Sequence, residues 1–430
     1  MTERSLRHVI LVAVGSAGDV HPFVGLGRTL RQRGYRVTLV TAGYFRGLVE
    51  AAGLEFIDPL PEVDFREMIR NPRIWHPLHG PRMIMDLAGR PLLEPIYRVI
   101  AGRHAQGQTL VVGSTLAFGA RVAQEHLGVP MVSVHLSPAI FRSLHEGPLL
   151  PGLCVHRGPI WFRKAQWYLA DTLVIDRMIG PWLNAFRTSL GLPRVRGIYR
   201  DWLHSPLKVL GMFPEWFAPR QPDWPPQLQL TGFPLYSEEG AVEPSAAVCD
   251  FIDAGPPPLV FTPGSANIFG RDFFTAAADA CRLLGRRGLL LTRFPEQLPA
   301  SLPACVRHFD FVPFRWLLKR SALLVHHGGI GSMSQALSAG VPQVIMPQGF
   351  DQFDNAARAA RLGVAASLPP RRFRGPAVAA LIDGLLADPA VAERCRKTAL
   401  LLTNSDGLDR GCDEIEAAWA VHTQGLARHE

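Results

Sequence analysis

The stretch Leu324-Val-His-His-Gly-Gly-Ile-Gly-Ser-Met-Ser-Gln-Ala-Leu337 decides the fold. Its apolar start predicts a buried parallel strand, its glycines predict a close backbone turn, and Ser332 is placed to cap a helix that runs to Ala339. Free backbone N–H groups at the start of a helix bind anions, so we expect phosphate to lie on this turn. The residues assigned to a diphosphate here are His326, His327, Gly329, Gly331 and Ser332.

The next expected strand, Gln343 to Met346, brings Asp351 and Gln352 to the same edge of the sheet. In open α/β sheets, ligands collect beyond the carboxyl ends of the strands. The ordered set of strand, glycine turn, histidines and acidic loop therefore indicates a pocket for a diphosphate that carries a sugar. A glycine-rich strand-to-helix turn with packed histidines and no ligand is the alternative.

A chain of 430 residues, 47% of them apolar, is long enough for two cores, so we expect two domains. Short apolar runs alternate with helical patterns in both halves, which predicts parallel strands joined by crossover helices. The strands expected in the first half are Val9–Val14, Val37–Thr41, Leu110–Val112, Met131–Val134 and Val209–Phe213. Those expected in the second half are Leu259–Thr262, Leu289–Thr292, Val306–Phe309, Leu323–Val325 and Val344–Met346.

Prolines crowd the segment 219–258, so few residues there can enter a helix or a central strand. We interpret this segment as the linker between the domains. The expected first domain covers residues 1–220 and the expected second domain covers 221–404. A C-terminal helix within 405–430 is expected to pack back on the first domain.

The chain carries 45 Lys and Arg against 37 Asp and Glu, a net charge of +8, without a run of basic residues. This distribution gives no support for a nucleic-acid partner, whereas attraction to a diphosphate or to anionic lipid head groups explains the excess. Six cysteines lie far apart without a C-x-x-C spacing. That spacing favours reduced thiols in a cytoplasmic protein, with neither disulfides nor zinc.

The sequence predicts no membrane span and no signal peptide, because nowhere do eighteen apolar residues run without a charge or a proline. Any membrane contact is therefore expected to be peripheral, at the inner face of the cell membrane. The segment Pro159-Ile-Trp-Phe-Arg-Lys-Ala-Gln-Trp-Tyr168 interleaves aromatic and cationic side chains, as an interfacial helix does. A helix that lines an apolar pocket fits the same pattern.

The first glycine turn, Gly15-Ser-Ala-Gly-Asp-Val-His-Pro22, follows the first strand and precedes a helix expected over Phe23–Arg33. Asp19 and His21 would then lie in a strand-to-helix loop that faces the cleft between the domains. The glycine spacing is a poor match to the G-x-G-x-x-G of nicotinamide-binding folds. Asp19 is the candidate catalytic base, and an acid stabilised by the helix dipole is its alternative. For His21 we expect no role.

A second glycine turn, Thr262-Pro-Gly-Ser-Ala-Asn267, brings Ser265 toward the diphosphate from the side opposite to His327. Phe311 and Val312, just after another strand, are candidates to stack on and hydrogen-bond a nucleobase. A plain turn and core packing of Phe311 are the alternatives. The chain contains no D-x-D pair, so we expect no metal. The helix dipole, histidine and backbone N–H groups would supply the positive potential instead.

Three segments, Gly15–Pro22, Thr262–Ser265 and His326–Asn355, resemble the family 1 glycosyltransferases of the GT-B fold. The resemblance covers nearly the whole chain. It implies an α/β architecture of two doubly wound, Rossmann-like domains that face each other across a cleft, the first binding the acceptor and the second the nucleotide sugar. There is also a narrower resemblance to the rhamnosyltransferases of rhamnolipid synthesis. It rests on Gly15-Ser-Ala-Gly-Asp-Val with Pro22-Phe23, Phe213-Pro-Glu-Trp-Phe-Ala-Pro219 with Asp223-Trp-Pro225, Thr231-Gly-Phe-Pro-Leu235, and Gly328-Gly-Ile-Gly331 with Asp351-Gln-Phe-Asp-Asn355.

By this resemblance, Asp19 falls where many relatives place a histidine base, and Asp351 and Gln352 fall at positions that hold the sugar hydroxyls. Phe311 stands where plant members carry tryptophan. Gln335 stands where they carry a ribose-binding glutamate, which permits a deoxyribose nucleotide such as dTDP. The resemblance thus implies a dTDP-sugar as co-substrate, with UDP as the alternative nucleotide.

Together these observations predict an inverting glycosyltransferase that moves L-rhamnose from dTDP-L-rhamnose to a hydroxy fatty acyl acceptor such as 3-(3-hydroxyalkanoyloxy)alkanoate. The product would be a mono-rhamnolipid type of glycolipid. Transfer of glucose or another sugar to a lipid, sterol or macrolide acceptor is the first alternative. A non-catalytic nucleotide-sugar-binding subunit and an epimerase are alternatives of other classes. Apolar residues such as Leu149 and Trp161 favour an acceptor pocket.

Overall fold

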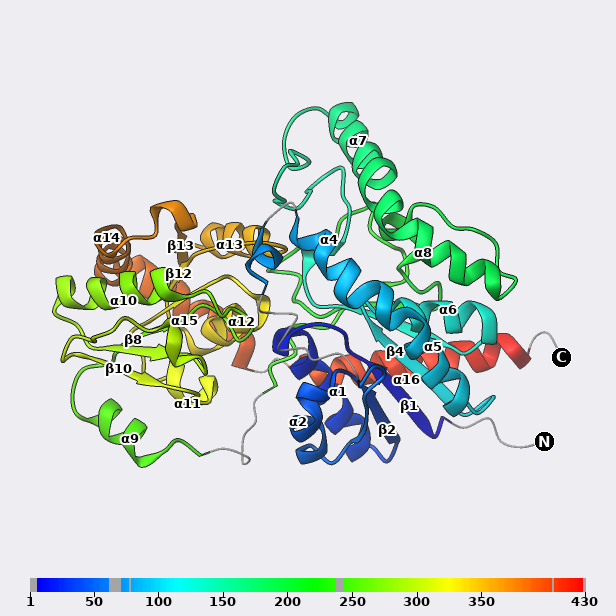
Figure 1. Cartoon of the computed structure of the whole chain (residues 1–430), viewed down its shortest axis with the longest axis horizontal. Helices are drawn as coiled ribbons and strands as arrows, with labels where there is room; N and C mark the ends of the chain where they lie inside the picture. Colours follow the sequence, from blue (N-terminus) through cyan, green and yellow to red (C-terminus); the bar gives the residue numbers. More distant parts are fainter. Residues whose placement is uncertain (1–5, 62–70, 77–78, 237–242, 404–405, 428–430) are drawn as a thin grey trace. The chain divides into compact units, whose positions relative to one another are not determined.

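The structure is a computed structural model that describes residues 6–61, 71–76, 79–236, 243–403 and 406–427. The chain divides into two compact units, both drawn in Figure 1. The first unit consists of Met1–Ile74, Leu78–Tyr236 and Asp406–Glu430. The second consists of Trp75–Pro77 and Ser237–Ser405.

The described part of the first unit is built on a seven-stranded parallel sheet with the order β3-β2-β1-β4-β5-β6-β7. Its strands are β1 (His8–Val12), β2 (Arg36–Val40), β3 (Glu55–Ile57), β4 (Thr109–Ser114), β5 (Met131–His135), β6 (Lys208–Gly211) and β7 (Leu228–Leu230). Its helices are α1 (Ala17–Gln32), α2 (Arg46–Ala51), α4 (Gly80–Ile84), α5 (Arg90–Arg103), α6 (Phe118–Leu127), α7 (Ile160–Leu169), α8 (Asp176–Ser189) and α16 (Gly407–Ala427). A π-helical turn, η5 (Ala170–Ile175), joins α7 to α8.

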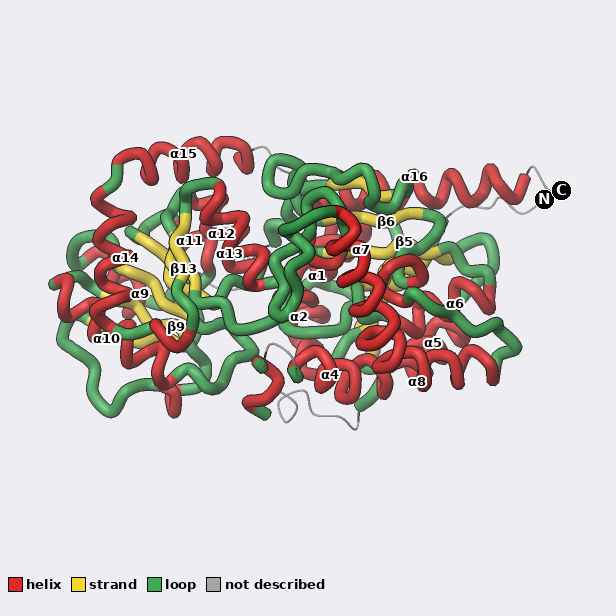
Figure 2. Tube along the Cα trace, turned by 90° about the horizontal axis from the view of Figure 1, so that it is seen from above, coloured by secondary structure: helices red, strands yellow, loops and turns green. Residues whose placement is uncertain are grey.

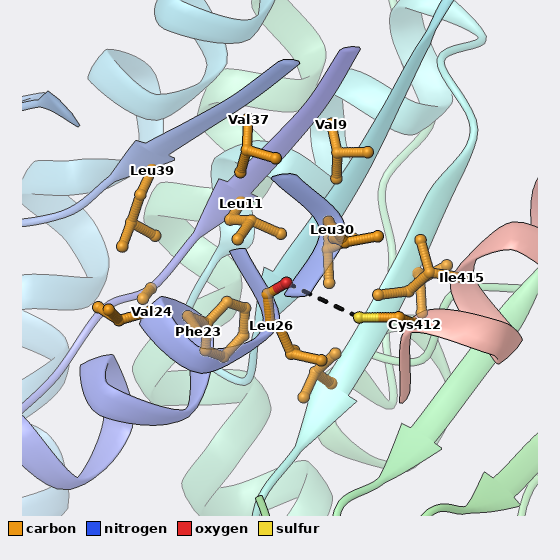
Figure 3. Close-up of a cluster of buried hydrophobic side chains, with 14 of the residues drawn as sticks. Val9, Leu11, Phe23, Val24, Leu26, Leu30, Val37, Leu39, Cys412 and Ile415 are labelled. Carbon is orange, nitrogen blue, oxygen red and sulfur yellow. Dashed lines mark hydrogen bonds between the residues drawn. The ribbon is translucent and has the colours of Figure 1, made fainter. Parts of the chain in front are cut away.

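Both faces of this sheet are covered by helices, because successive side chains of a strand point to opposite faces. Val9 of β1 belongs to the core under α1 and α16, whereas its neighbour Ile10 belongs to the core under α5 and α6. Figure 3 shows the first of these cores, in which the Cys412 thiol of α16 donates a hydrogen bond to the Leu26 carbonyl of α1. The C-terminal helix is therefore part of the first unit's core.

A charged cluster on the outer side of this contact also joins α1 to α16. Arg33, the residue that ends α1, forms ion pairs with Asp409, Asp413 and Glu416 of α16. The three acidic residues follow a spacing of three to four, so they share one face of the helix. The last helix of the chain is thereby held on the first helix by apolar packing and by charge.

The second unit is built on a six-stranded parallel sheet with the order β10-β9-β8-β11-β12-β13 among its described residues. Its strands are β8 (Leu259–Thr262), β9 (Gly288–Leu291), β10 (Val306–Phe309), β11 (Leu323–His326), β12 (Gln343–Ile345) and β13 (Ala365–Ser367). Its helices are α9 (Ala246–Asp253), α10 (Arg271–Leu284), α11 (Phe314–Leu318), α12 (Ile330–Ala339), α13 (Gln352–Arg361), α14 (Gly375–Ala387) and α15 (Pro389–Thr403). One core lies under α10 and α14 and the other under α9, α11 and α12. Figure 2 shows the strands of both units flanked by helices.

The expected α/β class with two doubly wound parallel sheets is confirmed. The first unit continues to Tyr236, beyond the boundary expected at residue 220, because β7 pairs with β6 inside the proline-rich segment. The same segment also contains the eight-residue helix α9, in a stretch where we expected little helix. Residues 237–242 of the expected linker and 428–430 of the expected C-terminal helix lie outside the described residues.

Two further features bear on the site and on membranes. α1 begins at Ala17 and contains Pro22 in its second turn, whereas the sequence led us to expect a start at Phe23. In the described part of the chain, no single helix is long and apolar enough to cross a bilayer. α14 and α15 pass that test only as a pair, and they are bent by 75° where they meet.

Candidate functional site

The turn after β11 is the centre of the site in the second unit. β11 lies between β8 and β12, so this turn leaves the sheet near the middle of its carboxyl edge. Gly328 adopts a φ of +95°, and a Cβ there would lie 2.9 Å from Cγ2 of Ile345. Both the dihedral and the space require glycine at this position.

α12 starts earlier than expected. Its N-cap is Gly329, its first residue is Ile330, and its first internal hydrogen bond runs from the Met333 N–H to the Gly329 carbonyl. Ser332 is therefore not the cap but the third residue of the helix. In a helix, the N–H groups that precede the first internal bond lack partners within the helix. Those of Ile330, Gly331 and Ser332 form such a set, which is what an anion site needs.

His326 does not take the role that we expected. The Gly328 N–H donates to its Nδ1 at 3.1 Å, so its Nε2 carries the proton and donates to the Gln343 side-chain oxygen at 2.9 Å. The side chain is fully buried, and burial lowers its pKa to about 3. Because both ring nitrogens are used inside the protein, His326 fixes the shape of the turn and leaves phosphate contacts to other groups.

His327 lies between the two glycine turns of this unit. A Cβ at Gly264 would lie 2.7 Å from its Cε1, and a Cβ at Gly329 would lie 2.5 Å from its Nε2. Its Nδ1 is shielded from solvent and has no hydrogen-bond partner among the described residues. Burial lowers its pKa to about 4, so the ring is neutral at pH 7 and can donate a hydrogen bond without bringing a positive charge. Ser265 lies exposed beside Gly264.

The expected nucleoside residues lie just after β10 and in α12. The Phe311 side chain is 38% exposed, whereas Val312 is buried in the core under α11 and α12, which leaves its backbone as the group that can bond a base. The Arg293 guanidinium, in the loop after β9, lies 5.2 Å from the centre of the Phe311 ring. Sequence reasoning missed Arg293, because a lone arginine in a loop belongs to no recognisable pattern. Gln335 is half-buried on α12, one turn beyond Gly331.

The expected sugar residues lie at the start of α13 and are already tied into the fold. Asp351 is the N-cap of this helix, and one of its carboxylate oxygens accepts a hydrogen bond from the Asn355 amide at 2.8 Å. The side-chain oxygen of Gln352 accepts from the N–H groups of Gln348 and Gly349. The amide nitrogen of Gln352 is therefore the atom that can donate to a sugar hydroxyl.

Asn355 connects the sugar end of the site to the phosphate turn. Its side-chain amide also donates to the Gly328 carbonyl at 3.0 Å, and the residue is fully buried. A second amide chain joins the neighbouring loops, since Asn267 donates to Gln348 and Gln297 donates to the Asn267 carbonyl. These amides were missed by sequence reasoning, because no local spacing marks a side chain that links two loops.

Phe350 has strained backbone at the same place. It is the only described non-glycine residue with a positive φ, +55°, and it immediately precedes Asp351. Such a conformation costs an ordinary residue about 1–2 kcal/mol and collects at functional sites. Its ring packs edge-on against Trp75, which belongs to the same unit, with 6.1 Å between the ring centres.

The acidic groups near the sugar end are engaged by protein partners. Asp354 forms a buried ion pair with Arg358 at 2.7 Å, and Asp351 accepts from Asn355. Among the residues that the structure describes, no group of three or more His, Cys, Asp or Glu side chains is arranged to hold a metal ion.

In the first unit, Asp19 lies in the first turn of α1 and not in a loop before it. Its Oδ2 accepts hydrogen bonds from the Ser16 N–H at 2.7 Å and from the Ser16 hydroxyl at 3.1 Å. The first of these bonds is one half of a capping box, whose other half runs from the Asp19 N–H to the Ser16 side chain. The spacing Ser16-x-x-Asp19 is the sequence pattern of such a box. These contacts hold the carboxylate in one orientation. His21 lies two residues further along α1, edge-on to Tyr236.

Other polar residues lie at the carboxyl ends of β4 and β5. The Val14 N–H, at the end of the first strand, donates to the Ser114 hydroxyl at 3.1 Å. His135 is hydrogen-bonded to Thr115 at 2.9 Å and to His204 at 3.1 Å. Burial lowers the pKa of both histidines, to about 4 for His204. This edge of the first sheet thus combines a fixed carboxylate with neutral polar groups.

Two family profiles match the chain. The profile of the glycosyltransferase family 28 N-terminal domain matches residues 9–145, and that of the erythromycin biosynthesis protein CIII-like C-terminal domain matches residues 291–401. The first match contains Asp19, and the second contains the β11–α12 turn and the start of α13.

Individual relatives extend the match to nearly the full length. The chain is 31% identical to an O-mycaminosyltylonolide 6-deoxyallosyltransferase of Streptomyces fradiae, over 97% of this chain and 100% of that protein. It is 25% identical to a sterol 3-beta-glucosyltransferase of Arabidopsis thaliana, over 94% of this chain and 67% of that protein. Among solved structures it is similar to the glycosyltransferase of kitacinnamycin, with a TM-score of 0.73, 21% identity and coverage of 96% and 99%. It is also similar to a spinosyn rhamnosyltransferase complexed with thymidine diphosphate, with a TM-score of 0.62, 18% identity and coverage of 98% and 100%.

Proposed function

The chain belongs to the GT-B nucleotide-sugar glycosyltransferases related to those of macrolide and antibiotic biosynthesis, and on that premise we propose that it transfers a deoxysugar from a dTDP-sugar to a hydroxyl group of a large apolar acceptor. The enzyme class is established by the full-length match, and the donor and acceptor are our proposal. The observation that carries it is the β11–α12 turn, where free N–H groups of a helix start meet a neutral histidine held between two glycines.

The relatives support the acceptor class that the sequence analysis gives as its first alternative. By their names, one transfers a deoxysugar to a macrolide and another a glucose to a sterol, and both match this chain along nearly its whole length. We therefore propose a macrolide-like or sterol-like acceptor in preference to a hydroxy fatty acyl acceptor. The narrower resemblance to rhamnolipid rhamnosyltransferases rests on short sequence motifs, so it gives the second candidate.

Support for dTDP comes from two directions. Gln335 replaces the ribose-binding glutamate implied by the family resemblance, which suits a nucleotide without a 2′-hydroxyl. A similar solved structure is described with thymidine diphosphate. The Phe311 ring and the Val312 backbone would hold the base, and Asp351 with the Gln352 amide would hold the sugar.

In the proposed reaction the acceptor oxygen attacks the anomeric carbon from the face opposite the diphosphate. Asp19 takes the proton of that hydroxyl, a C–O bond forms, and the bond from the anomeric carbon to the diphosphate oxygen breaks, so that dTDP leaves with the electron pair. One in-line displacement inverts the anomeric centre. Negative charge grows on the departing oxygen, where the first-turn N–H groups of α12 and a hydrogen bond from His327 stabilise it.

The test is a substrate panel read by mass spectrometry. The purified chain is incubated with dTDP- and UDP-linked sugars and with a macrolide aglycone, a sterol and a 3-(3-hydroxyalkanoyloxy)alkanoate. We expect a glycosylated macrolide or sterol, made from a dTDP-sugar. Transfer only to the hydroxyalkanoate would reject our acceptor and restore the second candidate, and products only from UDP-sugars would reject our nucleotide.

A further inference from the structure

Exposed apolar side chains are concentrated on one helical segment of the first unit. Of the fifteen large apolar side chains that are exposed in the described part of the chain, seven lie within the sixteen residues of α7 and η5. They are Ile160, Trp161, Phe162, Tyr168, Leu169, Leu173 and Val174, and their exposed fractions run from 40% to 71%. Contiguous apolar surface of this kind on a soluble fold marks an interaction site.

The opposite side of α7 is bonded to the first unit. The Trp167 indole N–H donates to the Ser143 carbonyl, the Arg163 guanidinium donates to the His145 carbonyl, and the Gln166 oxygen accepts from the Cys154 N–H. These three residues hold the loop that follows β5. The apolar side chains therefore face outward because the inward face of the helix is already occupied.

One exposed cation of α7, Lys164, accompanies the apolar residues. Lys164 is one helical turn from both Ile160 and Tyr168, so these three side chains lie along one stripe. No acidic residue occurs between Arg157 and Ala170. The first acid after them, Asp171, is buried and paired with Arg142, so it does not offset the positive charge of the exposed face.

We infer that the outward face of α7 and η5 lies flat on an anionic lipid surface. A helix that carries Trp, Tyr and aliphatic side chains beside lysine inserts its apolar groups at the head-group level while the cations meet lipid phosphates. A partner protein or a second copy of the chain would cover the same apolar area. In a contact between two copies, however, this face offers no exposed acid that could pair with Lys164. Figure 1 draws α7 at the margin of the first unit, continued by α8.

The experiment is co-sedimentation of the full chain with vesicles of pure phosphatidylcholine or of phosphatidylcholine mixed with phosphatidylglycerol. We expect binding to the anionic vesicles only. Two variants, Trp161→Glu with Tyr168→Glu, and Lys164→Glu alone, change exposed side chains and should leave the thermal unfolding midpoint unchanged. We expect the double variant to bind at least about a hundredfold more weakly and Lys164→Glu about thirtyfold more weakly. Should the double variant unfold, Lys164→Glu carries the test.

A matched control comes from α15, where Leu400 and Leu401 are 66% and 58% exposed. The variant Leu400→Glu with Leu401→Glu adds the same charge on a helix of the second unit and should bind like the unmodified chain. Equal loss in this control, equal binding to neutral vesicles, or no binding at all would overturn the inference. So would a wild-type dimer that Trp161→Glu with Tyr168→Glu converts to a monomer while vesicle binding persists. Vesicle binding needs neither donor nor acceptor, so its failure would leave the proposed transfer reaction unaffected.

Discussion

At the scale of single residues, Asp19 caps a helix and is also our proposed catalytic base, and one substitution can separate the two roles. Asparagine keeps an oxygen that accepts the Ser16 N–H, but it cannot take a proton. We expect Asp19→Asn to lower turnover by about a hundredfold or more, the typical contribution of a general base, and to leave dTDP affinity nearly unchanged. Steady-state rates and calorimetric titration with dTDP measure the two quantities.

Ser16→Ala is the matched control for this substitution. It removes the Ser16 hydroxyl that donates to Asp19 and leaves the carboxylate in place. We expect a loss of about 1 kcal/mol in unfolding free energy, as for other N-terminal caps, with turnover within a few-fold of normal. If Asp19→Asn behaves in the same way, Asp19 is a helix cap and another group is the base.

The neighbours of His327 allow a double-substitution test of its contact with the diphosphate. His327→Ala should weaken dTDP binding by about 1.5–3 kcal/mol, the loss expected for a hydrogen bond to a charged group. Gly329 has an ordinary backbone angle that alanine can adopt. The methyl group of Gly329→Ala would displace the His327 ring, however, so we expect a similar loss of dTDP binding. In the double variant the ring is gone and the methyl group meets nothing new, so the two losses should not add. Additive losses in calorimetry would show that Gly329 acts independently of His327.

The sequence predicted which residues lie at the site better than it predicted the role of each one. It placed His326 and His327 in one role, and the structure separates them because one ring points into the sheet and bonds to Gln343. It placed Asp19 in a loop because Pro22 suggested a helix start, although the capping-box spacing from Ser16 already indicated an earlier one. Which way a side chain points after a strand depends on contacts from distant strands, and local spacing does not contain them.

At the scale of elements, the strands in the middle of each sheet were predictable and most of the edges were not. All ten expected strands are present, and most of them have near-continuous apolar runs because helices cover both faces of each sheet. The three that were missed, β3, β7 and β13, are edge strands of three residues each. An edge strand is paired on one side only and its short run is half-buried, so its sequence carries little apolar signal.

The start of α12 makes a prediction in which stability and binding change in opposite directions. Gly331 is the second residue of this helix, and a Cβ there would meet no described atom within 4 Å. Alanine favours a helix over glycine by up to about 1 kcal/mol, so Gly331→Ala should raise the unfolding midpoint. A helical Cβ points toward the N-terminus, which is where the phosphates would lie, so dTDP affinity should fall about tenfold or more. Unchanged affinity would mean that the diphosphate does not use this helix start.

At the scale of the whole molecule, whether the reaction needs a metal ion depends on all the carboxylates that could bind one. The sequence has no D-x-D pair, and the acids nearest the expected sugar site are bonded to Asn355 and Arg358. We therefore expect transfer activity to survive a large excess of EDTA, with magnesium changing the rate only modestly. The measurement is the initial rate with and without chelator. Loss of activity in EDTA that magnesium or manganese restores would show that Asp351 or Asp354 holds an ion and that our assignment of the pocket is wrong.

Both units also bury neutral histidines, which ties the stability of the whole chain to pH. Burial lowers the pKa of His8 and His204 to about 4 in the first unit, and those of His326 and His327 to about 3 and 4 in the second. In the unfolded chain these groups titrate near 6.5. Below that pH the unfolded state binds more protons than the folded one. The stability of the folded state is therefore undiminished above about pH 6.5, and protonation of these histidines in the unfolded state lowers it as the pH falls toward 4.

His8 makes this linkage measurable, because it lies on β1, away from the expected site, and donates to the Thr38 hydroxyl at 2.8 Å. Each such histidine contributes a slope of up to about 1.4 kcal/mol per pH unit between its two pKa values. We expect the unfolding free energy to fall steeply between pH 6 and pH 5, and to fall by about 1 kcal/mol less in His8→Gln, whatever that variant's stability at pH 7. Urea unfolding at a series of pH values, followed by circular dichroism, gives both slopes. Equal slopes for the two proteins would mean that His8 is protonated in the folded state, and that its burial beside Arg36 does not keep it neutral.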